Sequence, residues 1–492
     1  MSWWHYFIVI IYGLCLSFVF FYSVSQFLLF LKAYSLTKPT NPAKKLSHFP
    51  KVCIQLPIYN EGEIVERLLK NIAQINYPTE ALEIQVLDDS TDDSLEKNQA
   101  LVKQLQQDGI PIQHFHRKNR TAFKAGALKE GLQQTKAEFI AVFDADFLPK
   151  ANWLQQTLGY FEDAEVGVVQ TRWGHLNKNY SLITQVQALA LDFHFCIEQV
   201  GRNRGNHLIN FNGTAGIWRK SCILDAGNWR GDTLTEDLDL SYRAQLKHWK
   251  IHYLNHVITP AELPIEMNAA RSQQFRWNKG AAENFRLNYA KVRKAAHLPI
   301  STKIHAFFHL LNSSLFFVIL TLAVLSFPVL FIKHEFPSSI SFFYGFTVLG
   351  LSTFLYMMGY AYTYFKENKF SLKSALQFVF KFFSFFALAM GLSVSNSKAI
   401  LEGHLGKKSS FIRTPKFNVL GKQKAKVKKG VPQRFKLINL IELGLLFYFI
   451  LALVYAFQVQ DFALFPFHLM LVFGFGFVTW STLQSRFFRL NQ

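Results

Sequence analysis

Long apolar runs lie at both ends of this chain, and a stretch with the composition of a soluble enzyme lies between them. A helix needs about 20 apolar residues to cross a bilayer. Runs of this length occur at 5–31, 306–332, 340–364, 434–457 and 462–484. The first run has no basic start, is too long for a signal peptide and offers no small-residue cleavage site, so it is interpreted as an uncleaved anchor. The sequence therefore predicts about five spans around one inserted domain.

A sixth apolar run, 375–395, is ambiguous because Lys381 lies inside it. A lysine near the centre of a bilayer costs about 2.5–3.5 kcal/mol. If this run crossed, the basic segment 406–436 would lie on the opposite side from 33–305, against the rule that basic loops stay in the cytoplasm. We therefore expect 375–395 to lie in the interface. The chain is then a multi-pass protein of the cytoplasmic (inner or plasma) membrane, with 33–305 and 366–433 in the cytosol.

The net charge of +20 comes from 53 Lys and Arg residues against 33 Asp and Glu residues. The positive-inside bias and contact with anionic lipid headgroups account for this excess, and the basic run 422–429 indicates a stripe that faces lipid. No nucleic-acid-binding module is visible in the sequence, so nucleic acid is not an expected partner. The four cysteines show no paired spacing and are predicted to be reduced thiols in a cytosolic setting.

The middle of the chain alternates strand and helix patterns. The segments 51–60, 82–90 and 138–146 read as strands, and 61–75 and 91–109 read as helices. This alternation predicts an α/β domain with a mostly parallel sheet that has helices on both faces. Ligands of such sheets bind beyond the carboxyl ends of the strands.

Two of the predicted strands end in pairs of carboxylates, Asp88–Asp89 and Asp144/Asp146. Like charges this close repel each other unless a cation lies between them. Mg²⁺ or Mn²⁺ suits such oxygen ligands and is commonly held by one or two carboxylates together with substrate phosphates. A divalent cation that arrives with a diphosphate is therefore our interpretation, and a helix cap or turn, which Asp also favours, is the alternative.

Five short motifs follow one another in a fixed order: LPIYNE (56–61), LDDS (87–90), DAD (144–146), TEDLDL (235–240) and QQFRW (273–277). Together they resemble the membrane-embedded processive family 2 glycosyltransferases, which include cellulose, mannan, chitin and hyaluronan synthases. The longer stretches FNGTAGIWRKSCILDAGNW and ELPIEMNAARSQQFRWNKG are similar to the cellulose-synthase-like A and C branches, which make mannan, glucomannan or xyloglucan backbones.

The resemblance implies a GT-A nucleotide-sugar domain inserted between transmembrane helices, with about five spans and interfacial amphipathic helices. The implied organisation is an anchor at 1–32, a cytoplasmic catalytic domain at 33–265, interfacial helices with the QxxRW motif at 266–305, two spans at 306–365, an interfacial helix and gating loop at 366–433, and two spans with a short tail at 434–492.

The resemblance also assigns roles to individual residues. Asp237 corresponds to the general base, although Glu236 and Asp239 are alternatives on the sequence alone. Asp144 and Asp146 correspond to metal ligands. The residues implied to bind the nucleotide sugar are Tyr59, Glu61, Asp88, Asp89, Lys124, Asp144, Gln273, Arg276 and Trp277. The residues implied to bind the acceptor are Phe211, Asn212, Gly213, Thr214, Glu236 and Trp277. FIRTPK (411–416) is similar to a gating loop, with Phe411, Thr414 and Lys416 at its motif positions and Arg413 where the family has Val.

These features predict an inverting hexosyltransferase that uses a divalent cation, Mg²⁺ or Mn²⁺, and polymerises UDP-glucose or GDP-mannose into a β-linked polysaccharide, which it translocates. Its expected partners are the nucleotide sugar, the growing polysaccharide and the lipid bilayer. A non-processive lipid glycosyltransferase, of the ceramide or diacylglycerol glucosyltransferase kind, is the alternative. A channel or transporter with a decayed soluble domain is disfavoured by the intact set of acidic motifs. The sequence does not indicate the donor, the linkage or any accessory subunit.

Overall fold

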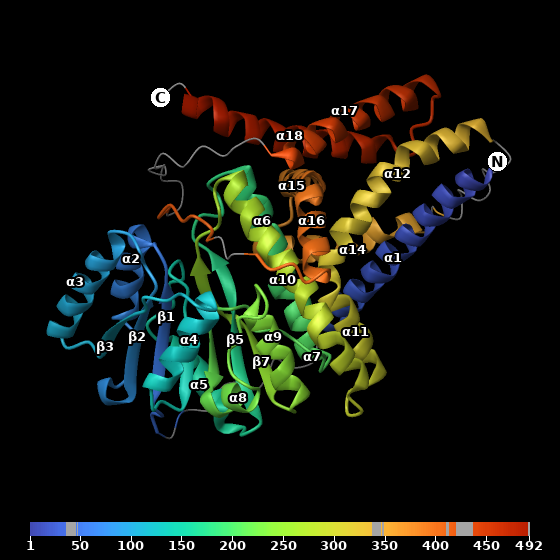
Figure 1. Ribbon diagram of the computed structural model, residues 1–492. Helices are drawn as coiled ribbons and strands as arrows, with labels where there is room; N and C mark the ends of the chain where they lie inside the picture. Colours follow the sequence, from blue (N-terminus) through green and yellow to red (C-terminus); the bar gives the residue numbers. More distant parts are fainter. Residues whose placement is uncertain are drawn as a thin grey trace.

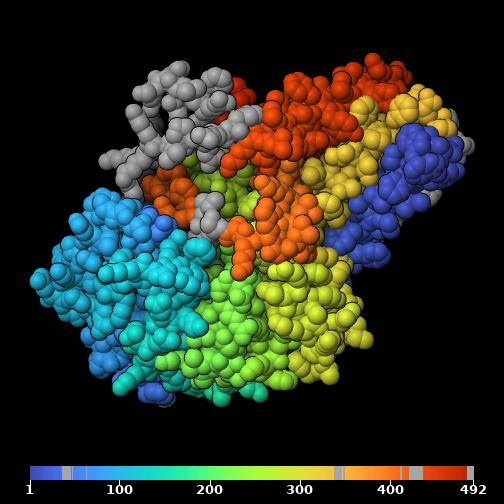
Figure 2. Space-filling view, viewed as in Figure 1, coloured from blue at the N-terminus to red at the C-terminus, as the bar shows by residue number. Residues whose placement is uncertain are grey.

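The computed structural model describes residues 1–35, 46, 48–336, 346, 349–409, 413–419 and 436–490. An α/β domain forms one part of the molecule, and long helices from both ends of the sequence form the other (Figure 1). The space-filling view shows the helices of the second half of the chain lying across one side of this domain (Figure 2). The predicted basic stripe at 422–429 and Phe411 lie outside the described residues.

The α/β domain is built on one sheet, in which the structure describes seven strands in the order β3-β2-β1-β4-β6-β5-β7. Strands β1, β2, β3 and β4 are parallel, whereas β6 runs antiparallel to β4 and β5, and β7 is parallel to β5. This confirms the predicted mixed, mostly parallel sheet. The strands are β1 (Val52–Ile58), β2 (Leu82–Asp88), β3 (Ile112–His116), β4 (Phe139–Val142), β5 (Val166–His175), β6 (Gly216–Arg219) and β7 (Lys250–Ala261).

Helices cover both faces of the sheet because each strand contributes buried apolar side chains to two separate cores. For example, Ile54 of β1 lies in one cluster with α2, whereas the neighbouring Cys53 lies in the other with α4. The helices of this domain are α2 (Gly62–Ile72), α3 (Ser94–Gln107), α4 (Phe123–Gln134), α5 (Trp153–Leu158), α6 (Leu182–Phe193), the π-helix η3 (His194–Gln199), α7 (Val200–Arg204), α8 (Lys220–Asp225) and α9 (Glu236–Leu246).

The remaining long helices flank the α/β domain. They are α1 (Trp3–Tyr34), α10 (Met267–Lys294), α11 (Ile300–Leu310), α12 (Leu315–Glu335), α14 (Ser352–Glu367), α15 (Leu372–Gly391), α16 (Ser393–His404), α17 (Leu437–Gln458) and α18 (Phe465–Leu490). Within the described residues, five helical stretches are long and apolar enough to cross a membrane: Trp3–Tyr34, Asn312–Glu335, Leu372–Gly391, Leu437–Gln458 and Phe465–Gln484. The chain is therefore a multi-pass membrane protein, with α1 and α12 packed side by side (Figure 1).

Helix α15 has the length and apolarity of a span, which differs from the interfacial position that we predict for 375–395. The residues that flank it contact the α/β domain and α10. Glu367, just before α15, forms ion pairs with Arg172 (2.5 Å) and Lys178 (3.0 Å), and Asn396, just after it, donates to Gln274 of α10 (3.1 Å). The predicted span 340–364 falls partly outside the described residues, and α14 covers its second half.

Helices α15 and α18 approach each other through glycines. A Cβ atom on Gly474 would lie 1.9 Å from the carbonyl oxygen of Ala387, whereas one on Gly476 would meet only a methyl group of Leu446 at 3.8 Å. We therefore expect Gly474→Ala to destabilise the protein by about 1–3 kcal/mol, because backbone atoms cannot move aside cheaply. The measurement is the melting temperature in detergent. Gly476→Ala is the matched control, since it adds the same helix-favouring methyl group without the clash. Equal melting temperatures for the two variants would contradict the predicted packing.

Candidate active site

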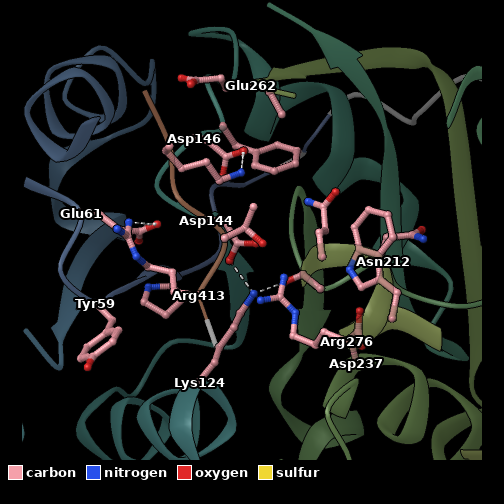
Figure 3. A pocket seen from close by; sticks show the side chains of 18 of the residues that line it. Tyr59, Glu61, Lys124, Asp144, Asp146, Asn212, Asp237, Glu262, Arg276 and Arg413 are labelled. Carbon is pink, nitrogen blue, oxygen red and sulfur yellow. Dashed lines mark hydrogen bonds and ion pairs between the residues drawn. The ribbon is translucent and has the colours of Figure 1, made fainter. Parts of the chain in front are cut away.

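One cavity lies beyond the carboxyl ends of β1, β2 and β4, and it is closed by α9, α10 and the segment 413–419, which we call the gating segment (Figure 3). Most of the residues predicted for the site line this cavity. They are Tyr59, Glu61, Asp89, Lys124, Asp144, Asp146, Asn212, Gly213, Glu236, Asp237, Gln273, Arg276, Trp277, Thr414 and Lys416. The structure thus brings together residues from motifs that are far apart in the sequence.

The carboxylates that follow β4 are each paired with a lysine. Lys124 of α4 contacts Asp144 through its Nζ atom at 2.5 Å, and Lys416 of the gating segment contacts Asp146 at the same distance. The backbone N–H of Asp144 donates to the hydroxyl of Thr214 (2.9 Å), which fixes the start of the loop. Burial lowers the pKa of Lys124, but the carboxylates of Asp144 and its neighbours outweigh this and raise it above its ordinary value.

The gating segment is attached to the catalytic domain on both sides of the cavity. Arg413 Nη1 lies 3.4 Å from Glu61 Oε1, and the backbone N–H of Phe417 donates to Glu262 (2.8 Å). Burial raises the pKa of Glu61 to about 7, although Arg413 opposes the shift. Within the described part of the chain, the hydroxyl of Thr414 is buried in this segment without a hydrogen-bond partner. It therefore remains available to an oxygen atom of a ligand.

The first turn of α9 supplies the carboxylates at the opposite end of the cavity. Desolvation and then the neighbouring Glu236 carboxylate raise the pKa of Asp237 to about 7, although Lys124 opposes the shift. Asn284 of α10 donates to the backbone oxygen of Thr235 (3.2 Å), so α10 holds this turn in place. The third carboxylate, Asp239, is bound by Arg243 (2.8 Å) and does not line the cavity. Only Glu236 and Asp237 among the three alternatives are therefore placed to act as a base.

Three residues of the QxxRW motif occupy one face of α10, because positions three and four apart share a face of a helix. Gln273, Arg276 and Trp277 all line the cavity. Desolvation lowers the pKa of Arg276, although Asp144 and Glu236 oppose the shift, and a guanidinium stays charged at any neutral pH. This helix therefore contributes a positive charge, an amide and a flat aromatic ring to the cavity.

The wall near β1 and β2 carries an aromatic ring and two arginines. The guanidinium of Arg120 lies 3.4 Å from the centre of the Tyr59 ring, a cation–π contact. Asp89 faces the cavity, yet Arg117 binds both of its oxygens, at 2.7 and 2.5 Å. In the view of Figure 3, Tyr59 and Asn212 lie at opposite ends of the cavity with Asp144 between them. The site is therefore elongated, with its acidic pair near the middle.

Three predicted site residues lie outside the cavity for clear physical reasons. Asp88 is fully buried and accepts hydrogen bonds from Ser90 and Asn98, so it holds the turn after β2 rather than a ligand. Phe211 is buried in the core behind the FNGT loop. Thr214 is fully buried, and its hydroxyl accepts a hydrogen bond from the backbone N–H of Asp144 on the side away from the cavity.

Some lining residues carry no prediction from the sequence. Arg120, Glu262 and Arg413 line the cavity. Arg120 lies four residues before the predicted ligand Lys124, and this proximity is the one sequence signal that indicates it. Glu262 pairs with Arg67 (3.2 Å), which is far away in the sequence, and no local pattern indicates this contact.

Asp144 and Asp146 supply only two carboxylates, which are too few ligands to fill the coordination shell of a metal ion. Among the described residues, no group of three or more His, Cys, Asp and Glu side chains is arranged to bind a metal. Two aspartates at a strand end nevertheless fit Mg²⁺ or Mn²⁺ when substrate phosphates complete the shell.

Comparison with known proteins agrees with the geometry. Residues 50–280 match the family described as "Glycosyltransferase like family 2". The chain is 37% identical over 280 residues to a probable glucomannan 4-beta-mannosyltransferase 4 from Oryza sativa subsp. japonica, which covers 56% of this chain and 50% of the relative. It is 37% identical over 267 residues to glucomannan 4-beta-mannosyltransferase 9 from Arabidopsis thaliana, with 53% and 50% covered. The chain thus spans about half the length of these relatives.

A solved structure shares the fold. It is the mannosyltransferase PcManGT from Pyrobaculum calidifontis in complex with GDP-Man and Mn²⁺, with a TM-score of 0.54 and 16% sequence identity over 81% of this chain and 100% of the other. At this identity the likeness concerns the fold alone, and it agrees with the predicted GT-A domain.

Proposed function

This chain belongs, through residues 50–280, to the family 2 glycosyltransferases, and on that premise we propose that it polymerises a hexose from a nucleotide sugar into a β-linked polysaccharide. The observation that carries the proposal is the gathering of Asp144, Asp146 and Asp237 with the QxxRW residues and the gating segment around one cavity. The relatives are named for mannosyl transfer. That name favours GDP-mannose over UDP-glucose as the donor.

The donor would lie along the elongated cavity, with its base near Tyr59 and its diphosphate near the acidic pair. Asp144 and Asp146 would hold a divalent cation between them and the phosphates, and the cation would supply stabilisation for the charge of the departing diphosphate. Lys124 and Arg276 bring two further positive charges to the same place. Once such a cation and phosphates are bound, Lys124 and Lys416 need no longer neutralise the carboxylates and can face phosphate oxygens instead.

Asp237 would take the proton of the acceptor. The acceptor hydroxyl oxygen would attack C1 of the donor sugar from the side opposite the diphosphate, the bond from C1 to the phosphate oxygen would break, and the hydroxyl proton would move to the Asp237 carboxylate. An α-linked donor would then give a β-linked product. A pKa near 7 suits a group that must accept a proton at neutral pH.

A second cavity supports processive synthesis with export. It lies between α1, η3, α12, α14 and α15, and its aromatic and polar lining fits a sugar chain. The lining includes Tyr22, His194, Phe193, Tyr356, Tyr360 and Phe386. We propose that the polysaccharide passes through it. The protein would lie in the inner or plasma membrane, with its catalytic domain in the cytosol.

The test is incubation of membranes that contain the full chain with labelled GDP-mannose or UDP-glucose and Mg²⁺ or Mn²⁺. We expect an insoluble labelled product that an endo-β-mannanase degrades and whose linkages are β. Membranes without the chain are the control. A product in which one sugar is attached to a lipid, with no polymer sensitive to a β-mannanase or β-glucanase, would contradict the proposal and favour the lipid glycosyltransferase alternative.

A further inference from the structure

The π-helix η3 lies between the two cavities and carries groups that take no part in the proposed transfer step at C1 of the donor. Its first residue, His194, lines the second cavity, as does Glu198, whereas Asn212 lines the catalytic cavity. His194 Nε2 lies 3.1 Å from Asn212 Nδ2, so this contact stands in the wall between the cavities. Short π-helical stretches are rare and frequently occur at functional sites.

The surrounding hydrogen bonds indicate which ring nitrogen of His194 donates and which accepts. Gln199 Nε2 donates to the carbonyl oxygen of Asn210 (2.8 Å), and an amide oxygen could not take this place. The same Nε2 atom therefore donates to Asn212 Oδ1 (2.7 Å), which turns Asn212 Nδ2 toward His194 as a donor. His194 Nε2 must then accept, so its proton lies on Nδ1 and is donated to Glu198 at 2.6 Å.

Glu198 is itself held in its charged form. Its side chain is 10% exposed, and the buried guanidinium of Arg202 lies 3.5 Å away. Burial raises the pKa of Glu198, but Arg202 and His194 outweigh this and keep it below its ordinary value. Two fixed partners thus hold the Asn212 amide, Gln199 on its oxygen and the pair of Glu198 and His194 on its nitrogen.

We propose that His194, oriented by Glu198, is a positioning residue that sets the Asn212 amide to receive the terminal sugar of the acceptor as the chain leaves the catalytic cavity. This inference rests on the proposed glycosyl transfer and adds a determinant of acceptor binding to it. One Nδ2 hydrogen of Asn212 is used by His194, and among the described residues Nδ2 has no second partner, so its other hydrogen is available to an acceptor oxygen in the catalytic cavity. Without His194 the amide loses one of the two contacts that fix its orientation.

A double-mutant cycle of His194→Phe and Asn212→Ala tests this role. We expect His194→Phe to lower transfer to acceptor by about tenfold, the effect of one lost polar contact. The KM for the nucleotide sugar should not change, and the fraction of donor hydrolysed to free sugar should rise. Because His194 acts through Asn212, the double variant should be no worse than Asn212→Ala alone. The melting temperature of each purified variant separates this effect from misfolding.

His309→Phe is the matched control, because His309 is another buried histidine, which bonds to Tyr242 (2.7 Å) and lines neither cavity. Its effect should be independent of Asn212→Ala and should leave the partition between transfer and hydrolysis unchanged. Additive losses for His194→Phe and Asn212→Ala, or a changed donor KM, would overturn the inference. The cycle is measured on whichever product the wild-type chain makes. A wild type that adds one sugar to a lipid therefore contradicts the polymerase proposal while the coupling is still tested.

Discussion

Asp237→Asn is expected to lower glycosyl transfer by about 10²–10⁴-fold, the usual contribution of a positioned general base. The amide has nearly the shape of the carboxylate but cannot accept the hydroxyl proton. Binding of the nucleoside diphosphate should persist, because Tyr59, Lys124 and Arg276 are unchanged. Radiolabel incorporation measures transfer, and calorimetric titration with GDP or UDP measures binding. A fully active Asp237→Asn enzyme would show that the proton goes elsewhere, and Glu236→Gln would then be the next variant to examine.

The pH dependence gives an independent check on the same residue. Asp237 must be ionised to accept a proton, and its pKa is raised to about 7, so transfer should increase as the pH rises through about 7. Stability should respond in the opposite direction. The folded state holds the proton more tightly than the unfolded chain, in which the group has its ordinary value of 3.8, so this group makes unfolding easier as the pH rises from about 4 to 7. Above that range Asp237→Asn should melt at a higher temperature than the wild type.

Asp239→Asn is the matched control for both measurements. It lies in the same turn of α9 but pairs with Arg243 and Asn288 outside the cavity. Removing one partner of a buried ion pair leaves the other charge uncompensated. We therefore expect Asp239→Asn to melt at a lower temperature and to retain the transfer rate of the folded fraction. An inactive but more stable variant beside an active but less stable one would separate catalysis from folding.

The sequence predicts the first half of the sheet well and the second half poorly. Strands β1, β2 and β4 have apolar runs followed by polar residues, and helices of amphipathic pattern separate them. Strand β6 has only four residues, GIWR, and pairs antiparallel with β4, so neither its length nor its direction shows in the local pattern. Strand β3 is short, lies at the edge of the sheet and buries only Ile112 fully, which gives a weak signal.

The site could be predicted where a motif ends at the cavity, but not where a distant partner decides the role. The LDDS motif does not distinguish Asp88 from Asp89. The structure distinguishes them. Asn98 and Ser90 donate hydrogen bonds to Asp88, whereas Asp89 faces the cavity and is bound by Arg117. The contact of Glu198 with His194 is local in sequence, yet its importance depends on Asn212, which arrives from a separate loop. Such roles become visible only in three dimensions.

The largest effect on the donor side is expected from the double variant Asp144→Asn/Asp146→Asn. Removing both carboxylates should lower transfer by about 10³-fold or more, because a cation that stabilises a departing diphosphate is worth several kcal/mol. Binding of Mn²⁺ in the presence of GDP, followed by electron paramagnetic resonance, should weaken in parallel, and this readout does not depend on turnover. Asp163→Asn serves as the control, since Asp163 pairs with Lys250 at the exposed surface and should change neither quantity.

Lys416 adds a sharper form of this prediction. Its Nζ atom lies 2.5 Å from Asp146, so a metal ion and this lysine compete for one carboxylate. Lys416→Ala should therefore bind Mn²⁺ at least as tightly as the wild type while transferring sugar more slowly, because the gating segment loses a cation that can face the phosphates. In Lys416→Ala the Mn²⁺ affinity should thus stay the same or rise while the rate of sugar transfer falls. In the Asp144→Asn/Asp146→Asn variant both quantities should fall. A wild type whose transfer persists in EDTA, together with a double variant of undiminished activity, would show that these carboxylates hold lysines and not a metal ion.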